Sequence, residues 1–195
     1  MLWLFTGDSI TQGAEHTGGA RSYPQLFEEW IRYERGRPHD FVVNTAISGN
    51  FAEDLLAEYE ERVARFRPDA VAVMLGTNDA VRGVAGQGAY RRALDEVVGR
   101  ATRGGARAIV LTPPGVTPGA TTRVPYVAAY AQAARDVAER NKATLVDIFA
   151  DWTDRDGGTP RAWMDDAFHP NARGHREIAR LLAARIDDAI VKGLF

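Results

Sequence analysis

The chain has 195 residues, of which 45% are hydrophobic and 26% charged, enough apolar material for one globular domain with a sizeable core. A formal net charge of −2 gives no reason to expect nucleic acid or an anionic membrane surface as a partner. The absence of cysteine excludes disulfides, thiolate catalysis and thiolate metal sites.

The first predicted element is a short apolar strand, residues 2–5, which runs into Thr6-Gly7-Asp8-Ser9. A short apolar run ended by glycine is typical of a strand that is buried on both faces. The run is too short for a signal-peptide core or a membrane span, and no basic leader precedes it. We therefore expect a cytoplasmic protein without a membrane span, while a secreted mature form whose leader was removed stays open.

Strands and helices alternate along the rest of the chain. Further strands are predicted at residues 41–43, 70–75, 108–111 and 144–147. The first helix is predicted to begin after Ser22, because Pro24 and Gln25 follow it in the pattern of a helix start, with a polar loop over residues 11–21 before it. Apolar residues at helical spacing predict the buried faces of five helices: Tyr23, Leu26, Phe27, Trp30 and Ile31; Leu55, Leu56, Tyr59 and Val63, ended by Pro68; Tyr90, Leu94, Val97, Val98 and Ala101; Val127, Tyr130, Ala134 and Val137; Ile178, Leu181, Leu182, Ile186 and Ile190.

Continuous hydrophobicity in the strands, with a helix between each pair, is the pattern of a parallel sheet covered on both faces. We predict an α/β fold, a three-layer α/β/α sandwich with a flavodoxin-like five-stranded sheet in the order 2-1-3-4-5. With no internal repeat and no linker in the sequence, residues 1–195 are predicted to form a single domain.

Serine is scarce, so the candidate nucleophiles are few: Ser9, Ser22 and Ser48. Ser22 is explained as a helix cap, which leaves Ser9 and Ser48. Ser9 follows the first strand, and the carboxyl edge of a parallel sheet is where ligands bind in such folds. The Gly7-Asp8-Ser9 turn is not a G-x-S-x-G elbow, so we expect no strained strand-turn-helix there.

Of the four histidines, His169 has the setting of a general base. Asp166 lies three residues before it in a turn, where a carboxylate can reach Nδ1 and leave Nε2 to take a proton from a serine. Asp165 is the alternative partner. The competing interpretation of this segment is an Asx-turn followed by a helix cap at Asn171. His16 and His39 lie in predicted loops and are expected to be solvated. His175 lies in the last predicted helix and is expected to be a surface or packing residue.

Three further groups could stabilise an oxyanion, and each follows a different strand. They are the N–H of Ser9, the N–H of Gly49, where a Cβ would obstruct close approach, and the side-chain amide of Asn78. Asn78 could instead be a left-handed turn residue. All three map to the same edge of the predicted sheet.

Taken together, Gly7-Asp8-Ser9, Gly49, Gly76-Thr77-Asn78-Asp79 and Asp166-Ala167-Phe168-His169-Pro170 resemble the four sequence blocks of the SGNH (GDSL) hydrolase family. They occur in the family's order and span nearly the whole chain. The resemblance implies a flavodoxin-like sandwich and metal-independent hydrolysis of carboxylic esters or thioesters without a cofactor. It also implies Ser9 as nucleophile, His169 as base, Asp166 as its partner, and Ser9, Gly49 and Asn78 as the oxyanion hole.

The sequence departs from the family around the second block, because many members have a glycine where Ala46 stands and a small hydroxyl residue near the position of Phe51. The departure puts the substrate class in doubt. A compact domain without a large lid favours an open site for a short acyl ester, such as an acetyl ester of a sugar or small metabolite. The candidate substrate-binding residues are Asp8, Phe51, Arg21, Trp163 and Phe168, although loop packing explains the aromatic ones equally well.

Several other functions stay open at this point. A lysophospholipase or thioesterase would act on longer acyl chains, and an O-acyltransferase would form the same acyl-enzyme. A metal hydrolase would use Asp8, Asp79, Asp166 and His169, and a binding domain on the same fold would have no catalytic activity. The oligomeric state is not predicted.

Overall fold

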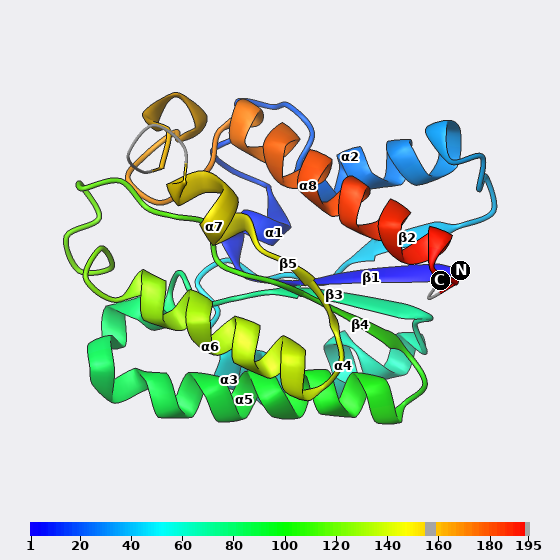
Figure 1. Ribbon diagram of the computed structural model, residues 1–195, viewed down its shortest axis with the longest axis horizontal. Coiled ribbons are helices and arrows are strands. Elements are labelled where there is room, and N and C mark those ends of the chain that lie inside the picture. The colour runs from blue at the N-terminus through cyan, green and yellow to red at the C-terminus, as the bar shows by residue number, and fades with distance from the viewer. Residues whose placement is uncertain (155–158, 194–195) are drawn as a thin grey trace.

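The computed structural model describes residues 1–154 and 159–193 and contains a parallel sheet between two layers of helices (Figure 1). The sheet has five strands in the order β2-β1-β3-β4-β5, as the sequence predicts. The strands are β1 (Leu2–Gly7), β2 (Phe41–Asn44), β3 (Ala70–Met74), β4 (Arg107–Leu111) and β5 (Thr144–Val146). The architecture is the expected three-layer α/β/α sandwich.

Helices cover both faces of the sheet (Figure 1). One face packs against α2 (Tyr23–Glu29), which a π-helical segment at Trp30–Glu34 continues, and α8 (Ala172–Val191). The other face packs against α3 (Ala52–Ala57), α4 (Tyr59–Arg62), α5 (Gly83–Arg103) and α6 (Val127–Arg140). The short elements are α1 (Ser9–Gln12), α7 (Ile148–Thr153) and 3₁₀ turns at Ala64–Phe66, Asp79–Arg82 and Arg161–Trp163.

Successive side chains of the central strands point to opposite faces, which divides the core into two clusters. Val71 and Val73 of β3 join the cluster under α5 and α6, whereas Ala72 and Met74 join the cluster under α2 and α8. All five residues of β3 are buried. The uninterrupted hydrophobicity of this strand therefore follows from its two covered faces.

The register of β1 and β3 brings their carboxyl ends level. Gly7 pairs with Met74, so the chain leaves both strands at the same point. Ser9 and the segment that follows β3 consequently lie at one edge of the sheet. The loop after β2 joins them there, because the amide of Ile47 donates to the carbonyl of Gly7 at 3.1 Å.

Three local expectations are corrected by the structure. A short helix, α1, begins directly at Ser9, where the sequence predicted none, and it takes Thr11 and Gln12 out of the predicted loop. The predicted second helix is divided into α3 and α4, and a 3₁₀ turn follows α4 before Pro68. Asp147, predicted as the end of the last strand, instead caps an unpredicted helix, α7, by accepting the Ala150 amide at 3.2 Å. Residues 155–158 of the predicted loop after this helix lie outside the described residues.

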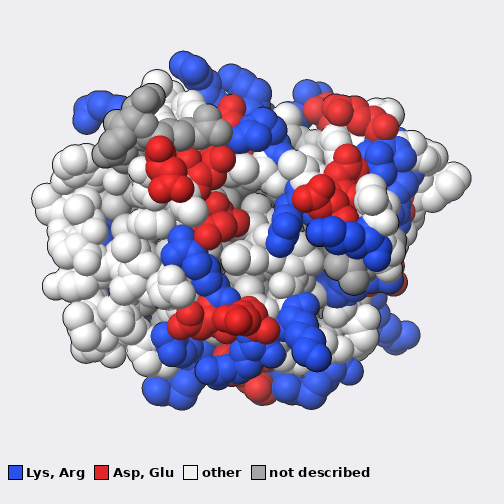
Figure 2. Space-filling view, in the orientation of Figure 1, with Lys and Arg blue, Asp and Glu red and all other residues white. Residues whose placement is uncertain are grey.

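Charged side chains of both signs are interspersed over much of the face in Figure 2. The left side of that view, where the strands end and α5 and α6 begin, is mainly uncharged. Two stretches of the sequence there, residues 108–122 and 124–134, contain no charged residue. Within the described ranges, no helix combines the length and hydrophobicity needed to cross a membrane.

The turn at Gly7 predicts a large cost for any side chain at this position. A Cβ would lie 2.2 Å from the carbonyl oxygen of Met74 and 2.6 Å from Oγ1 of Thr11. Because backbone blocks relaxation, Gly7→Ala should lower the free energy of unfolding by about 2–3 kcal/mol. Urea denaturation followed by circular dichroism measures this change.

A matched control is Gly88→Ala in α5, where the glycine is exposed on a regular helix. Alanine has the higher helix propensity, so this variant should gain ~0.5–1 kcal/mol. Equal effects of the two substitutions would contradict the steric argument.

Candidate active site

Ser9, His169 and Asp166 form one hydrogen-bonded line at the carboxyl edge of the sheet. Oγ of Ser9 lies 3.0 Å from Nε2 of His169, and Nδ1 of His169 lies 2.7 Å from Oδ2 of Asp166. Ser9 is the first residue of α1, while His169 and Asp166 come from the loop before α8. Residues 160 positions apart in the chain thus meet in one group.

Asp166 acts both as an Asx-turn residue and as the partner of His169. Its Oδ1 accepts the backbone amides of Phe168 at 2.8 Å and His169 at 2.6 Å, which leaves Oδ2 for the imidazole. Asn171 caps α8 by accepting the amides of Arg173 and Gly174. The segment therefore contains the Asx-turn and the helix cap, and the same carboxylate also contacts the imidazole of His169.

The geometry fixes the proton on His169. An ionised carboxylate only accepts hydrogen bonds, so Nδ1 carries the hydrogen and Nε2 is free to accept from Ser9. Burial lowers the pKa of His169, although Asp166 opposes the effect. Burial raises the pKa of Asp166, but hydrogen bonds from the imidazole and two amides outweigh it and leave the pKa below its usual value. Both shifts favour a neutral imidazole beside a carboxylate.

Asp8 fixes the start of the helix that carries Ser9. Its Oδ1 accepts the amide of Ile10 at 3.0 Å, which makes Asp8 the N-cap of α1. The residue is 1% exposed, and burial raises the pKa of its carboxyl to about 7. Asp8 was expected to bind substrate; the structure corrects this, because a carboxylate with so little exposed surface holds the helix instead.

The three candidate oxyanion donors lie at the ends of three neighbouring strands. The Ser9 amide is at the first position of α1, where a helix leaves its N–H groups without intrahelical partners. Asn78 follows β3 in a right-handed conformation, not the left-handed one considered from the sequence, and its Nδ2 donates to the carbonyl of Asn50 at 3.1 Å. A second amide hydrogen of Asn78 is thereby left for another acceptor.

Gly49 is a glycine because of its backbone conformation. Its φ of +81° lies in the left-handed region, and a Cβ would meet no atom within 4 Å among the described residues. The backbone conformation therefore gives a reason for glycine beside the expected one, that a Cβ would obstruct the approach of a ligand. Gly49 is exposed, as an amide that meets a ligand must be.

The buried guanidinium of Arg62 joins these segments, and sequence reasoning missed it. Its Nη2 donates to the carbonyl of Gly7 at 3.2 Å, its Nε to the carbonyl of Thr45 at 3.0 Å, and its Nη1 to Oδ1 of Asn50. Arg62 therefore ties the end of β1 to the loop that carries Gly49. A signal was present, since Arg62 lies three residues after Tyr59, on the apolar face of the predicted helix.

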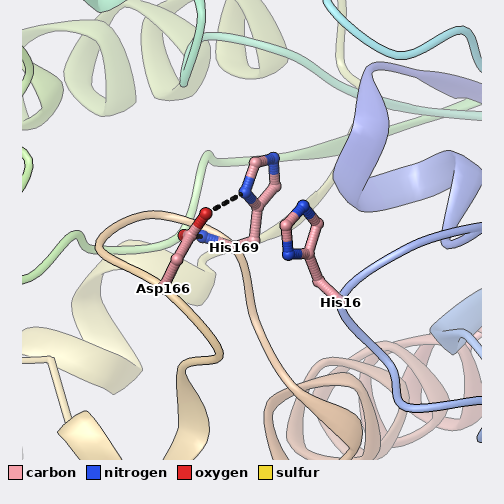
Figure 3. A group of neighbouring side chains, drawn as sticks. All are labelled: His16, Asp166 and His169. Atoms are coloured by element: carbon pink, nitrogen blue, oxygen red, sulfur yellow. Dashed lines mark hydrogen bonds and ion pairs between the residues drawn. The ribbon is translucent and has the colours of Figure 1, made fainter.

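The carboxylate-histidine cluster considered from the sequence does not assemble. Oδ1 of Asp79 accepts the amide of Ala52 at 3.0 Å, and burial raises the pKa of Asp79 to about 6. Among the described residues, the group that gathers three possible metal ligands is instead His16, Asp166 and His169 (Figure 3). Its two imidazole rings are stacked 7° from parallel, so their in-plane lone pairs do not converge on one ion.

The other predicted substrate-binding residues are engaged in packing. Arg82 lies over the ring of Phe51 at 4.1 Å and Arg123 over the ring of Phe168 at 3.9 Å. Trp163 is half-buried and meets the ring of Trp152 edge-on at 5.2 Å. Arg21 is exposed and pairs with Glu29 of α2.

His16, expected to be solvated, lies inside the group. Its ring stacks on that of His169 with centroids 3.8 Å apart, and its Nδ1 lies 2.8 Å from Oδ2 of Asp165. Asp165, the alternative partner for His169, thus holds a different histidine. The predicted packing role of His175 is confirmed, since it is 1% exposed beneath the site. No pattern in the loop sequence identifies His16, because its position depends on how the loop folds back.

Comparison with known proteins identifies the family of the chain. Residues 5–177 match the model of the GDSL-like lipase/acylhydrolase family. The chain is 30% identical to Esterase TesA of Pseudomonas aeruginosa over 86% of this chain and 78% of the relative. It is 39% identical to the acetylxylan esterase of Geobacillus stearothermophilus over 40% of each chain.

A solved structure of an esterase also aligns with nearly the whole chain. The crystal structure of Axe2, an acetylxylan esterase from Geobacillus stearothermophilus, aligns with a TM-score of 0.81 and 26% identity, over 95% of this chain and 93% of that one. Two of the curated relatives are matched over less than half of their length, 9% and 40%.

The buried carboxyl of Asp8 predicts a pH-dependent stability. The unfolded chain loses this proton near pH 4, whereas the folded chain keeps it until about pH 7, so the folded state binds more protons between these values. The contribution of Asp8 to stability therefore falls as the pH rises through this window. Asp8→Asn keeps the helix cap without the charge, and should gain up to about 4 kcal/mol above pH 7 and nothing below pH 4.

Thermal unfolding of the variant and the wild type at pH 4, 5.5 and 8 measures this difference. A gain of the same size at pH 4 and pH 8 would show that burial of the charge is not its cause.

Proposed function

Because the chain belongs to the GDSL-like lipase/acylhydrolase family, we propose that it is a serine esterase that cleaves carboxylic esters through an acyl-enzyme. The observation that carries the proposal is the line from Ser9 through His169 to Asp166, with distances of 3.0 and 2.7 Å. A hydroxyl, a base and an orienting carboxylate in this order are the parts of a nucleophilic triad.

In the proposed reaction, Oγ of Ser9 attacks the ester carbonyl while Nε2 of His169 takes its proton. His169 then protonates the leaving alcohol, and the acyl group stays on Ser9. A water molecule repeats the sequence from the other direction, losing its proton to His169 and releasing the acid. Asp166 keeps the ring in the required tautomer and stabilises the imidazolium. Neither a metal nor a cofactor takes part.

The negative charge of the tetrahedral intermediate is received by the amides of Ser9 and Gly49 and the side chain of Asn78. Such donors act through pre-organisation, so their fixed positions matter as much as their presence. The side chain of Asn78 donates to the carbonyl of Asn50. Arg62 in turn donates to the side chain of Asn50. The hole is thus braced from outside by Arg62.

The proposed substrate is a short-acyl ester, most simply an acetyl ester of a sugar or small metabolite. Ser9 is half-buried, and Gly49 and Asp166 are exposed, which suits an open, shallow site. The mainly uncharged edge around the strand ends favours an uncharged alcohol (Figure 2). The names of the Geobacillus relatives point to acetyl esters as well.

Longer acyl chains form the second candidate substrate class, as in a lysophospholipase or thioesterase. Four apolar side chains in the segments that follow the strands are exposed: Ile47 at 41% and Val124 at 42% in loops, Val81 at 42% in the 3₁₀ turn after β3, and Val84 at 70% in the first turn of α5. They offer contact surface for an acyl chain that extends beyond the site.

Removing the nucleophile tests the reaction itself. Ser9→Ala should abolish turnover of p-nitrophenyl acetate, and His169→Ala should lower kcat by at least about 1000-fold, because these residues act as a unit. Both variants should unfold cooperatively like the wild type. Activity of Ser9→Ala near the wild-type level would reject the proposal, and loss of activity on dialysis against EDTA would reject its metal independence.

A series of p-nitrophenyl esters from two to twelve carbons tests the substrate class. For the short-acyl proposal, kcat/KM should be highest at acetate and fall steadily with chain length, and acetylated sugars should be turned over. A maximum at eight carbons or more would favour the longer-chain candidate.

The bracing role of Arg62 gives a further prediction. Arg62→Lys keeps the positive charge but cannot span three acceptors, so the oxyanion donors should lose their fixed positions. We expect kcat to fall roughly 10- to 100-fold with KM nearly unchanged. Arg65→Lys is the matched control, since Arg65 is exposed, pairs with Glu61 and lies over the ring of Phe66, away from Gly7, Thr45 and Asn50. Equal kcat values for the two variants would contradict the role.

A further inference from the structure

The imidazole of His16 lies flat on the imidazole of His169 (Figure 3). The ring centroids are 3.8 Å apart and the planes differ by 7°. His16 comes from the loop between α1 and α2, so the segment that follows the nucleophile also reaches the base. This stack is not needed for the proton transfer described above.

Two consecutive carboxylates hold the two stacked rings. Asp166 bonds to Nδ1 of His169 at 2.7 Å, and Asp165 bonds to Nδ1 of His16 at 2.8 Å. The amide of Asp165 also donates to the carbonyl of His169 at 2.9 Å, which fixes the turn between them. In its neutral form each histidine therefore has the same tautomer, with hydrogen on Nδ1 and the lone pair on Nε2, which in His169 faces Oγ of Ser9.

The backbone of His16 is held in an uncommon conformation. Its φ is +65°, in the left-handed region that costs a residue with a Cβ about 1 kcal/mol. Gly13, Gly18 and Gly19 in the same loop also have positive φ. The loop thus adopts a defined fold that directs the His16 ring onto His169, against its local preference.

We propose that His16, held by Asp165, is a positioning residue that fixes the ring orientation of His169 and limits the charge that His169 can carry. The proposal rests on the esterase function proposed above and assigns His16 no contact with substrate. The pair of His16 and Asp165 acts through His169 and not on the substrate.

The orientation half of the proposal follows from contact. A ring at 3.8 Å prevents the His169 imidazole from tilting toward it, and Phe168 contacts His169 at 4.2 Å. The imidazole must keep Ser9 and Asp166 in line at the same time, and a displacement of about 1 Å can cost on the order of 100-fold in rate.

The charge half follows from the groups that face His169. Asp166 favours the imidazolium, whereas Arg123 and a protonated His16 oppose it, and the pKa of His169 is lowered by burial first and then by these cations. His175 of α8 lies close enough to sense the charge on His169, and Glu15 and Asp165 face His16. Removing the imidazole of His16, and with it the positive charge that it carries when protonated, should therefore raise the pKa of His169.

Two substitutions separate the halves. His16→Phe keeps a flat ring without a charge, and should keep kcat on p-nitrophenyl acetate at pH 8 within about 3-fold of the wild type. His16→Gln keeps a donor toward Asp165 but loses the ring and the charge, and should lower kcat roughly 10-fold with little change in KM. His39→Gln, an exposed histidine beside the start of β2, is the control and should leave both values unchanged.

The pH profile gives the readout that a merely structural role would not move. A neutral His169 is the active form, so a higher pKa shifts the acid limb of kcat/KM to higher pH. We expect this shift in His16→Gln to be about 0.5 pH unit. An unmoved limb would overturn the charge half of the proposal.

A titration that needs no activity keeps this test separate from the proposed function. In protein labelled with ¹⁵N-histidine and carrying Ser9→Ala, the His169 signal should titrate at higher pH when His16→Gln is added. Residual esterase activity in Ser9→Ala would overturn the function and not the coupling. Equal losses of kcat and of melting temperature in His16→Phe and His16→Gln would overturn the orientation half, as would unchanged kcat in His16→Gln.

Discussion

The position of Ser9 depends on the close contact of two backbones at Gly7. The carbonyl oxygen of Met74 occupies the place that a Cβ of Gly7 would take, so β1 and β3 can end side by side only with glycine there. The carbonyl of Gly7 then accepts Ile47 and Arg62, and Asp8 turns the chain into α1. Ser9, the loop that carries Gly49, and Arg62 are thus all positioned by one turn.

This arrangement concentrates buried charge beneath the site. Asp8 and Asp79 are both almost fully buried, and each raises the free energy of the folded state when ionised. One oxygen of Asp79 is without a hydrogen-bond partner among the described residues. Burying these two carboxyls lowers the stability of the folded chain. They nevertheless fix α1 and α3, because they accept the amides of Ile10 and Ala52, which apolar side chains could not do. The two carboxyls that position the site therefore also make the folded chain less stable.

The sequence predicted the strands and the four blocks because these depend on local patterns: continuous hydrophobicity, glycine turns and the spacing from Asp166 to His169. It did not predict features that depend on tertiary contact. The short α1 forms because Asp8 is buried as its cap, and a four-residue helix has no periodicity to detect. His16 looked like a solvated loop residue because its partner, Asp165, lies 149 positions away. Arg62 was detectable only as a charge on an apolar face.

Substrate selection follows from what the aromatic side chains already contact. Guanidinium groups cover one face of Phe51 and of Phe168, and Trp163 packs against Trp152. Rings engaged in this way offer a sugar little stacking surface, so we expect the alcohol to be recognised mainly by hydrogen-bonding groups of the loops. Such groups accept many small uncharged alcohols, because none of them demands one ring geometry. We then expect discrimination on the acyl side, where the size of the group beside Gly49 and Asn78 would decide whether the carbonyl oxygen reaches the proposed oxyanion donors. We therefore expect the enzyme to be selective for the acyl group and tolerant of the alcohol.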